Sequence, residues 1–285
     1  MRKTLHLVFL ACAVHSVTAL EWPVAEPVPS SFFGQRAFGI IERGIVMDKV
    51  DTIRSSDNGS LMLTLKKNKN MSGFPGTLGN AAIIAHDEGL ITIYGNLDSV
   101  DRISELLTLE SGTILGTAGT SGWGKPASCI FQVLDGEKHT VLNPLLLLPQ
   151  LSDTHGPAIK DVIVIASNEQ IYALGTTKSV KQGKYKLYAD IPDTVNASSN
   201  SLSPFRITIE VNGSEYSSIP FELLKETNGE LYLSEINFTW KNLYRDPVRI
   251  YLGELSLTRG RADISIIARD TAGNEHSVLF GLQID

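Results

Sequence analysis

Short apolar segments separated by turn residues recur along most of this chain and constrain its fold more than any other feature. Leu61–Leu65, Ala81–Ala85 and Leu90–Tyr94 are segments of this kind in the first half. Tyr185–Asp190 and Phe205–Val211 alternate apolar and polar residues in the second half. Short runs and a two-residue alternation are typical of β-strands. The sequence therefore predicts an all-β, mainly antiparallel fold.

One segment departs from this pattern. Its apolar residues recur at intervals of three and four, a spacing typical of a helix; they are Val100, Ile103, Leu106 and Leu107. We therefore expect a short helix within residues 100–109.

The N-terminus has the features of a secretory signal. Arg2 and Lys3 precede an apolar run over Leu5–Val14, and Ala19 supplies a small residue before a cleavage point. A second interpretation places a lipid on Cys12, because residues 9–12 loosely match a lipoprotein box. This apolar run is too short to span a bilayer, and no later run is long enough either. We therefore expect an exported protein of the periplasm or cell envelope without a transmembrane segment.

Removal of the signal changes both the charge and the cysteine count. The chain has 25 basic and 31 acidic residues, and Arg2 and Lys3 leave with the signal, so 23 basic residues face 31 acidic ones and the net charge becomes −8. This balance argues against nucleic acid or a bare anionic lipid surface as the partner. Cys129 then remains without a disulfide partner, and its apolar neighbours predict a buried thiol.

The chain is long enough for two domains, and its texture changes near residues 150–156. We expect a signal peptide over 1–19, an extended lead-in over 20–37, a first domain over 38–149, a linker over 150–156 and a second domain over 157–285. Strand patterns over Ala262–Asp270 and Val278–Ile284 flank turn residues in the second domain. Short strands at this spacing favour an antiparallel β-sandwich.

Four segments of the first domain combine apolar strands with glycine turns in a fixed order. They are Ile41–Met47, Ile83–Leu97, Gly112–Gly122 and Ser128–Val133. In order and spacing they resemble the M23 (lysostaphin/LytM-like) peptidase domain, whose members cut peptidoglycan cross-bridges. The end of the chain, from Gly260 onward, resembles the final hairpin of bacterial Ig-like domains. The two resemblances imply a LytM-like β-sheet domain followed by an Ig-like β-sandwich.

The resemblance also implies which positions held the metal. Members of that family bind one zinc through a first His, an Asp four residues later and the second His of a His-x-His motif. These three positions correspond here to Glu42, Val46 and Ile130. A catalytic zinc needs three protein donors and an open position, and valine and isoleucine have no lone pair to donate. We therefore expect that the zinc has been lost and that the chain has no metal cofactor.

Two further family histidines assist the zinc-bound water, and their positions correspond to Asn96 and Ser128. Both residues can form hydrogen bonds, but neither exchanges a proton near neutral pH as histidine does. The histidines after the signal are scattered and do not suggest a relocated metal site; they are His86, His139, His155 and His276.

These positions favour a non-catalytic envelope protein that binds peptidoglycan or an envelope protein partner, with regulation of cell-wall hydrolases as one such role. The residues expected to line or flank the former substrate groove are Glu42, Tyr94, Asn96, Trp123 and Ser128. Two alternatives remain open at this stage. One is an M23 metalloendopeptidase that cuts peptidoglycan peptide bonds through an atypical site, and the other is a purely structural envelope module.

Overall fold

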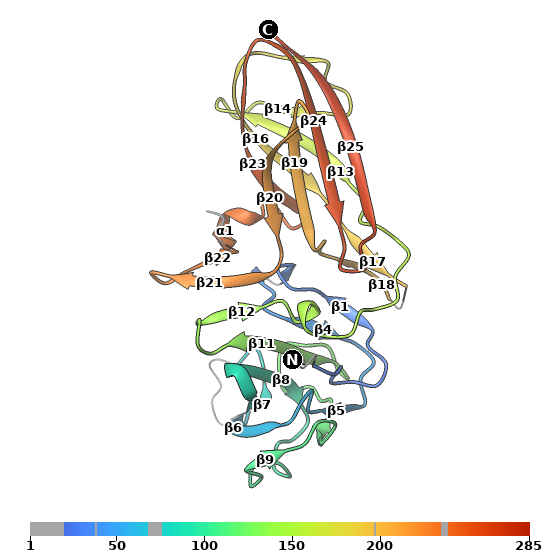
Figure 1. Cartoon of the computed structure of the whole chain (residues 1–285), viewed down its shortest axis with the longest axis vertical. Coiled ribbons are helices and arrows are strands. Elements are labelled where there is room, and N and C mark those ends of the chain that lie inside the picture. Colours follow the sequence, from blue (N-terminus) through green and yellow to red (C-terminus); the bar gives the residue numbers. More distant parts are fainter. Residues whose placement is uncertain (1–19, 38, 68–75, 197, 235–238) are drawn as a thin grey trace, which may run out of the picture.

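The computed structural model describes residues 20–285 apart from 38, 68–75, 197 and 235–238 (Figure 1). The expected signal peptide and Cys12 lie outside the described residues. Strands account for most of the regular structure, and almost every strand pair is antiparallel. The all-β prediction is therefore confirmed.

A long twisted sheet forms the half of the molecule that contains the N-terminal part of the chain (Figure 1). Its neighbouring strands are, in order, β9 (Thr108–Leu109), β6 (Gly59–Leu65), β7 (Asn80–Ala85), β8 (Leu90–Leu97), β11 (Cys129–Asp135) and β12 (Thr140–Leu142). Strand β4 (Ile45–Met47) pairs with β11 and with β1 (Pro29–Ser31). The apolar side chains that alternate along β4, β8 and β11 fill the core beneath this sheet, among them Ile45, Tyr94 and Phe131.

Short elements complete this half. Strand β5 (Thr52–Arg54) pairs with β10 (Ile114–Thr117), and β2 (Arg36–Ala37) pairs with β3 (Ile40–Ile41). Two 3-10 helices lie at Asp87–Gly89 and Pro144–Leu146.

The predicted helix within residues 100–109 does not form. Residues 101–105 make turns, and β9 then pairs with β6. The helical spacing of the apolar residues gave a wrong prediction because these residues do not form one buried face. Val100 and Ile103 are buried, whereas Leu107 is 82% exposed. Ser99 and Asp101 instead close a local turn, in which the Ser99 hydroxyl accepts a hydrogen bond from the Asp101 amide.

The second half is a β-sandwich of two facing sheets (Figure 1). One sheet contains β14 (Ile171–Ala173), β13 (Lys160–Ala166), β16 (Gly183–Asp190) and β23 (Arg249–Leu257), and the other contains β15 (Ser179–Val180), β25 (Glu275–Ile284), β24 (Gly260–Arg269), β19 (Arg206–Val211) and β20 (Ser214–Pro220). Inward-facing residues of both sheets form one core, including Leu187, Ile264 and Leu252. Asn212 and Gly213 both have positive φ, so they form the tight turn between β19 and β20.

The two halves exchange elements. Strand β21 (Leu223–Thr227), with its partner β22 (Glu230–Leu233), leaves the sandwich and pairs with β12 of the first sheet (Figure 1). The hairpin of β17 (Asp193–Val195) and β18 (Ser198–Leu202) places Val195 and Leu202 in the first core. In return, Phe33 of the N-terminal segment packs into the sandwich core.

The single described α-helix, α1 (Trp240–Leu243), precedes β23. Residues 149–159, which include the segment expected to be a linker, contain neither helix nor strand. Of the helices in the described part of the chain, none has the length and apolar character needed to cross a membrane.

Candidate functional site

The strand register builds the floor of a groove of about 200 Å³. Strands β4 and β11 are antiparallel, and Val46 lies directly opposite Ile130. Their chain neighbours Ile45 and Phe131 point into the core and are completely buried. Because side chains alternate along a strand, Val46 and Ile130 point to the other face, where they line the groove. Two of the positions that the resemblance assigned to zinc ligands are therefore adjacent.

The groove is lined by residues from several segments of the first half. Glu42 lines the groove together with the Val46–Ile130 pair, and Gln132 continues the same face of β11. The other side chains that shape its walls include Ser30, Gln35, Asp48, Leu78, Trp123 and Lys125. Trp123 is 47% exposed, so a large part of its ring is accessible to a ligand.

The side chains at the three family positions do not fit zinc. Val46 and Ile130 are apolar, and Glu42 alone supplies a donor oxygen. That carboxylate accepts a hydrogen bond from the Arg43 amide at 3.1 Å. Burial raises the pKa of Glu42, while hydrogen bonds from the backbone of Arg43 and Gly44 oppose the shift. The second carboxylate, Asp48, forms an ion pair with Lys125 at 3.1 Å. No described residue that lines the groove is a histidine or cysteine.

The Asn96 side chain lies behind the groove and holds the turn over residues 119–128. Its Nδ2 lies 3.0–3.1 Å from four acceptors, which are the carbonyl oxygens of Gly119, Lys125 and Ser128 and the Ser128 hydroxyl. Its Oδ1 accepts a hydrogen bond from the Gly122 amide at 3.0 Å. The Asn96 backbone has φ 65°, which turns the end of β8 toward this segment.

Ser128 completes this hydrogen-bond network. Its hydroxyl donates to the Lys125 carbonyl oxygen at 2.6 Å and accepts from Asn96. Asn96 and Ser128 are both fully buried. The two positions that carry assisting histidines in the resembled family therefore hold the loop that presents Trp123 and Lys125.

Tyr94 was predicted to belong to the groove, and the structure places it elsewhere. It lies opposite Phe131 in the strand register, and the two rings pack in the core with centroids 5.3 Å apart. Its hydroxyl accepts hydrogen bonds from the Ser56 amide and the Thr92 hydroxyl. Burial raises the pKa of Tyr94. Because residues paired across antiparallel strands share a face, Tyr94 follows Phe131 into the core.

The groove thus contains Glu42 and Trp123 of the five residues expected there, whereas Tyr94, Asn96 and Ser128 are buried behind it. Sequence reasoning missed Asp48, Lys125, Gln35 and Gln132. The alternation of β11 could have indicated Gln132, because it lies two residues beyond Ile130. Gln35 reaches the site from the N-terminal segment, and no local pattern signals that contact.

Cys129 was predicted to be buried, and it is. The residue has no exposed surface, and burial raises the pKa of its thiol to about 12. It therefore acts as a core side chain next to the groove residue Ile130.

Comparison with known sequences finds a bacterial relative. An uncharacterized protein of Treponema pallidum (strain Nichols) is 37% identical over 124 residues, which cover 40% of this chain and 84% of the relative. The chain belongs to the family of this Treponema pallidum protein. A family model that has no functional description also matches residues 156–285.

Several solved structures resemble part of this chain. The catalytic domain of a mutant of the prophage-encoded M23 protein EnpA from Enterococcus faecalis is 20% identical, with 45% of this chain and 95% of that one covered and a TM-score of 0.36. The SpoIIQ–SpoIIIAH pore forming complex gives 18% identity, 47% and 92% coverage and a TM-score of 0.36. A zinc containing peptidase from Vibrio cholerae gives 21% identity, 41% coverage of this chain and a TM-score of 0.34, and the match spans 36% of that protein. None of these similarities assigns an activity or a ligand to the chain.

Proposed function

We propose that this chain is a non-catalytic binding protein of the bacterial cell envelope whose groove binds a peptide segment. This proposal rests on the side chains at the five positions that the resemblance assigns to zinc ligands and assisting histidines. Val46 and Ile130 form an apolar floor, Asn96 and Ser128 are buried in structural hydrogen bonds, and Glu42 is the single donor left. Together they supply fewer than the three donors that a catalytic zinc needs, and Glu42 is the one titratable group among them that lines the groove.

The lining favours a peptide as the ligand. Binding sites combine apolar surface with a few polar groups that fix orientation. Val46, Ile130 and Trp123 supply the apolar surface, and the amide of Gln132 supplies donors and an acceptor. Extended peptides present both kinds of group along their length.

The net charge of the chain indicates which kind of peptide it binds. With the signal removed, the net charge is −8, which favours a segment with basic side chains over an anionic glycan strand. We therefore propose an envelope protein as the partner, with a peptidoglycan peptide as the alternative that the experiment must separate. Export rests on the signal pattern of residues 1–19.

The test begins with purified protein comprising residues 20–285. Elemental analysis is expected to find far less than one zinc per chain, and labelled muropeptides are expected to remain intact with or without added zinc. Zinc-dependent cleavage by the pure protein would overturn the proposal. Stoichiometric zinc that is lost in Glu42→Ala would reopen the enzymatic alternative.

Binding is then measured by fluorescence polarisation with two labelled probes, a peptidoglycan stem peptide and a peptide of mixed basic and apolar residues. Trp123→Ala is expected to weaken binding of the basic peptide by about ten-fold or more, because exposed aromatic anchors dominate such sites. Tyr216→Ala is the matched control, since Tyr216 is 48% exposed and belongs to the sandwich. Trp123-dependent binding of the stem peptide alone would reassign the partner to peptidoglycan. Binding of neither probe would favour a structural module.

A further inference from the structure

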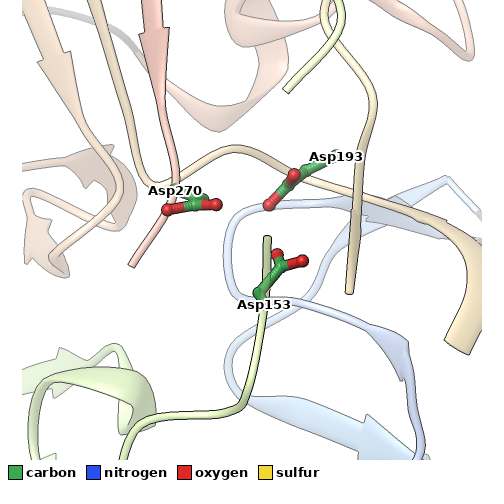
Figure 2. Close-up of side chains that lie close together, drawn as sticks. All are labelled: Asp153, Asp193 and Asp270. Atoms are coloured by element: carbon green, nitrogen blue, oxygen red, sulfur yellow. The ribbon is translucent and has the colours of Figure 1, made fainter. Parts of the chain in front are cut away.

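Three aspartates meet where the connecting segment reaches one end of the sandwich (Figure 2). Asp153 lies in the segment over residues 149–159, Asp193 opens β17, and Asp270 directly follows β24. One carboxylate oxygen of each lies within 4.8 Å of the others. These residues are far apart in the chain, so only the fold brings them together and no local pattern indicates the cluster.

All three side chains are shielded from solvent. The Asp153 side chain is 2% exposed, and the exposed fractions of Asp193 and Asp270 are 2% and 3%. Oδ1 of Asp153 accepts a hydrogen bond from the His155 amide at 3.1 Å, but its buried Oδ2 has no hydrogen-bond partner. Figure 2 shows the Asp153 carboxylate directed toward the other two. A buried oxygen without a partner is costly, so this atom indicates a missing ligand.

The cluster lacks a compensating positive charge. In the described part of the chain, no lysine or arginine forms an ion pair with any of the three aspartates. The imidazole of His155 is exposed, and its Nδ1 lies 3.7 Å from Asp153 Oδ1. Burial, and then the neighbouring carboxylates of Asp270 and Asp153, raise the pKa of Asp193 to about 8 against a hydrogen bond from the Thr194 amide. A bound cation would relieve this repulsion.

The donor chemistry and spacing select the cation. The ligands are all oxygen atoms, which suit hard cations and not zinc or copper. Calcium binds oxygens at about 2.3–2.6 Å, so two oxygens on one ion lie at most about 5 Å apart. The oxygens of the cluster lie within that limit, and the variable coordination geometry of calcium suits three carboxylates from separate segments better than the near-ideal octahedron that magnesium demands.

Neighbouring groups already orient the ligands. The amide side chain of Asn274 donates to Asp270 Oδ2 at 2.7 Å and to the Asp153 carbonyl oxygen at 3.3 Å. The Asn274 backbone amide donates to Asp270 Oδ1 at 2.8 Å. These bonds tie the turn after β24 to the connecting segment, so a metal bound beside them would strengthen an existing link.

We propose that Asp153, Asp193 and Asp270 bind one Ca²⁺, which fastens the segment joining the two halves to the loops at the end of the sandwich. Water completes the shell of about six to eight oxygens. This inference is independent of the proposed peptide groove, because it uses no residue of that site.

Calcium titration of the full mature chain tests the proposal. Protein stripped with EDTA and dialysed is titrated with CaCl₂ and, separately, MgCl₂ by isothermal calorimetry. We expect one Ca²⁺ per chain, with a dissociation constant in the range of roughly 10⁻⁶–10⁻³ M, and a melting temperature that rises with Ca²⁺ concentration. Magnesium is expected to bind more weakly.

Single substitutions connect the binding to the cluster. Asp153→Asn and Asp270→Asn are each expected to weaken Ca²⁺ binding by about ten-fold or more, because each removes a charged ligand. Their melting temperatures in EDTA should equal or exceed that of the wild type, which shows that the loss is not misfolding. Asp161→Asn, an exposed position of the same half, is the control and should bind like the wild type. Absence of Ca²⁺ binding, binding of Mg²⁺ alone, or Ca²⁺ binding unchanged in both variants would each overturn the proposal.

Discussion

Asn96 is a buried side chain whose amide holds a surface loop. In the resembled family this position carries a histidine that assists the metal-bound water. A neutral imidazole has one N–H donor, whereas the Asn96 amide offers two N–H donors and an acceptor and uses them on the turn over residues 119–128. In this chain Asn96 therefore positions the loop through hydrogen bonds.

Removal of the Asn96 amide should loosen that loop. Asn96→Ala leaves buried carbonyl oxygens and the Gly122 amide without partners, so we expect the free energy of unfolding to fall by about 2–3 kcal/mol. Urea denaturation followed by tryptophan fluorescence measures this loss. Asn168→Ala serves as the control, because Asn168 is exposed and accepts one bond from Gln170. Wild-type stability in Asn96→Ala would show that the network does not hold the loop.

The strand patterns did not predict that the β21–β22 hairpin joins the first sheet. β21 and β22 follow β20 in the chain but extend the first sheet at β12. An uncovered β12 would expose a row of unpaired backbone groups, and β21 satisfies them. Asn143 reinforces this joint between β12 and the segment that leads into β21. Its backbone N–H donates to the Glu222 carbonyl oxygen at 2.7 Å, and its side-chain Nδ2 donates to the Phe221 carbonyl oxygen at 2.7 Å. Periodicity identifies strands but not their partners in a distant part of the chain.

Gly34 offers a direct test of this joint. It has φ +80°, and a Cβ at that position would lie 2.4 Å from a ring carbon of Phe221. Gly34→Ala should therefore lower the free energy of unfolding by about 2 kcal/mol or more, through the left-handed backbone and the displaced ring together. Thermal or urea unfolding measures the change.

A matched glycine separates the two causes. Gly213 has φ +76° and no atom within 4 Å of its Cβ position. Gly213→Ala should cost only the backbone term, about 1 kcal/mol. Equal losses in the two variants would mean that the Phe221 contact does not contribute.

The molecule as a whole consists of two halves that share strands and cores. Further side-chain hydrogen bonds cross the junction between the halves. Gln35 Nε2 donates to the Ser201 carbonyl oxygen at 2.9 Å, and the Tyr244 hydroxyl donates to the Gly34 carbonyl oxygen at 2.9 Å. Ser203 also donates to the carbonyl oxygen of Phe33, the residue that packs in the sandwich core. Such exchange couples the stability of one half to that of the other.

The mature chain should therefore unfold as one cooperative unit. We expect a single calorimetric transition with a ratio of calorimetric to van't Hoff enthalpy near one, because neither core closes without residues from the other half. Limited proteolysis should accordingly yield no long-lived fragment cut within residues 149–159. Two separated transitions, or a stable fragment over 157–285, would contradict this coupling.

The sequence by itself determined the all-β class, most strands and the burial of Cys129, because these follow from local alternation and residue type. It also determined that Val46 and Ile130 cannot donate to a metal, since that depends on side-chain chemistry alone. The tertiary structure decided which residues share the groove, sent Tyr94 into the core and joined β21 to β12. It also gathered Asp153 with two distant carboxylates. Those outcomes depend on strand register and on contacts between remote segments, which local patterns do not encode.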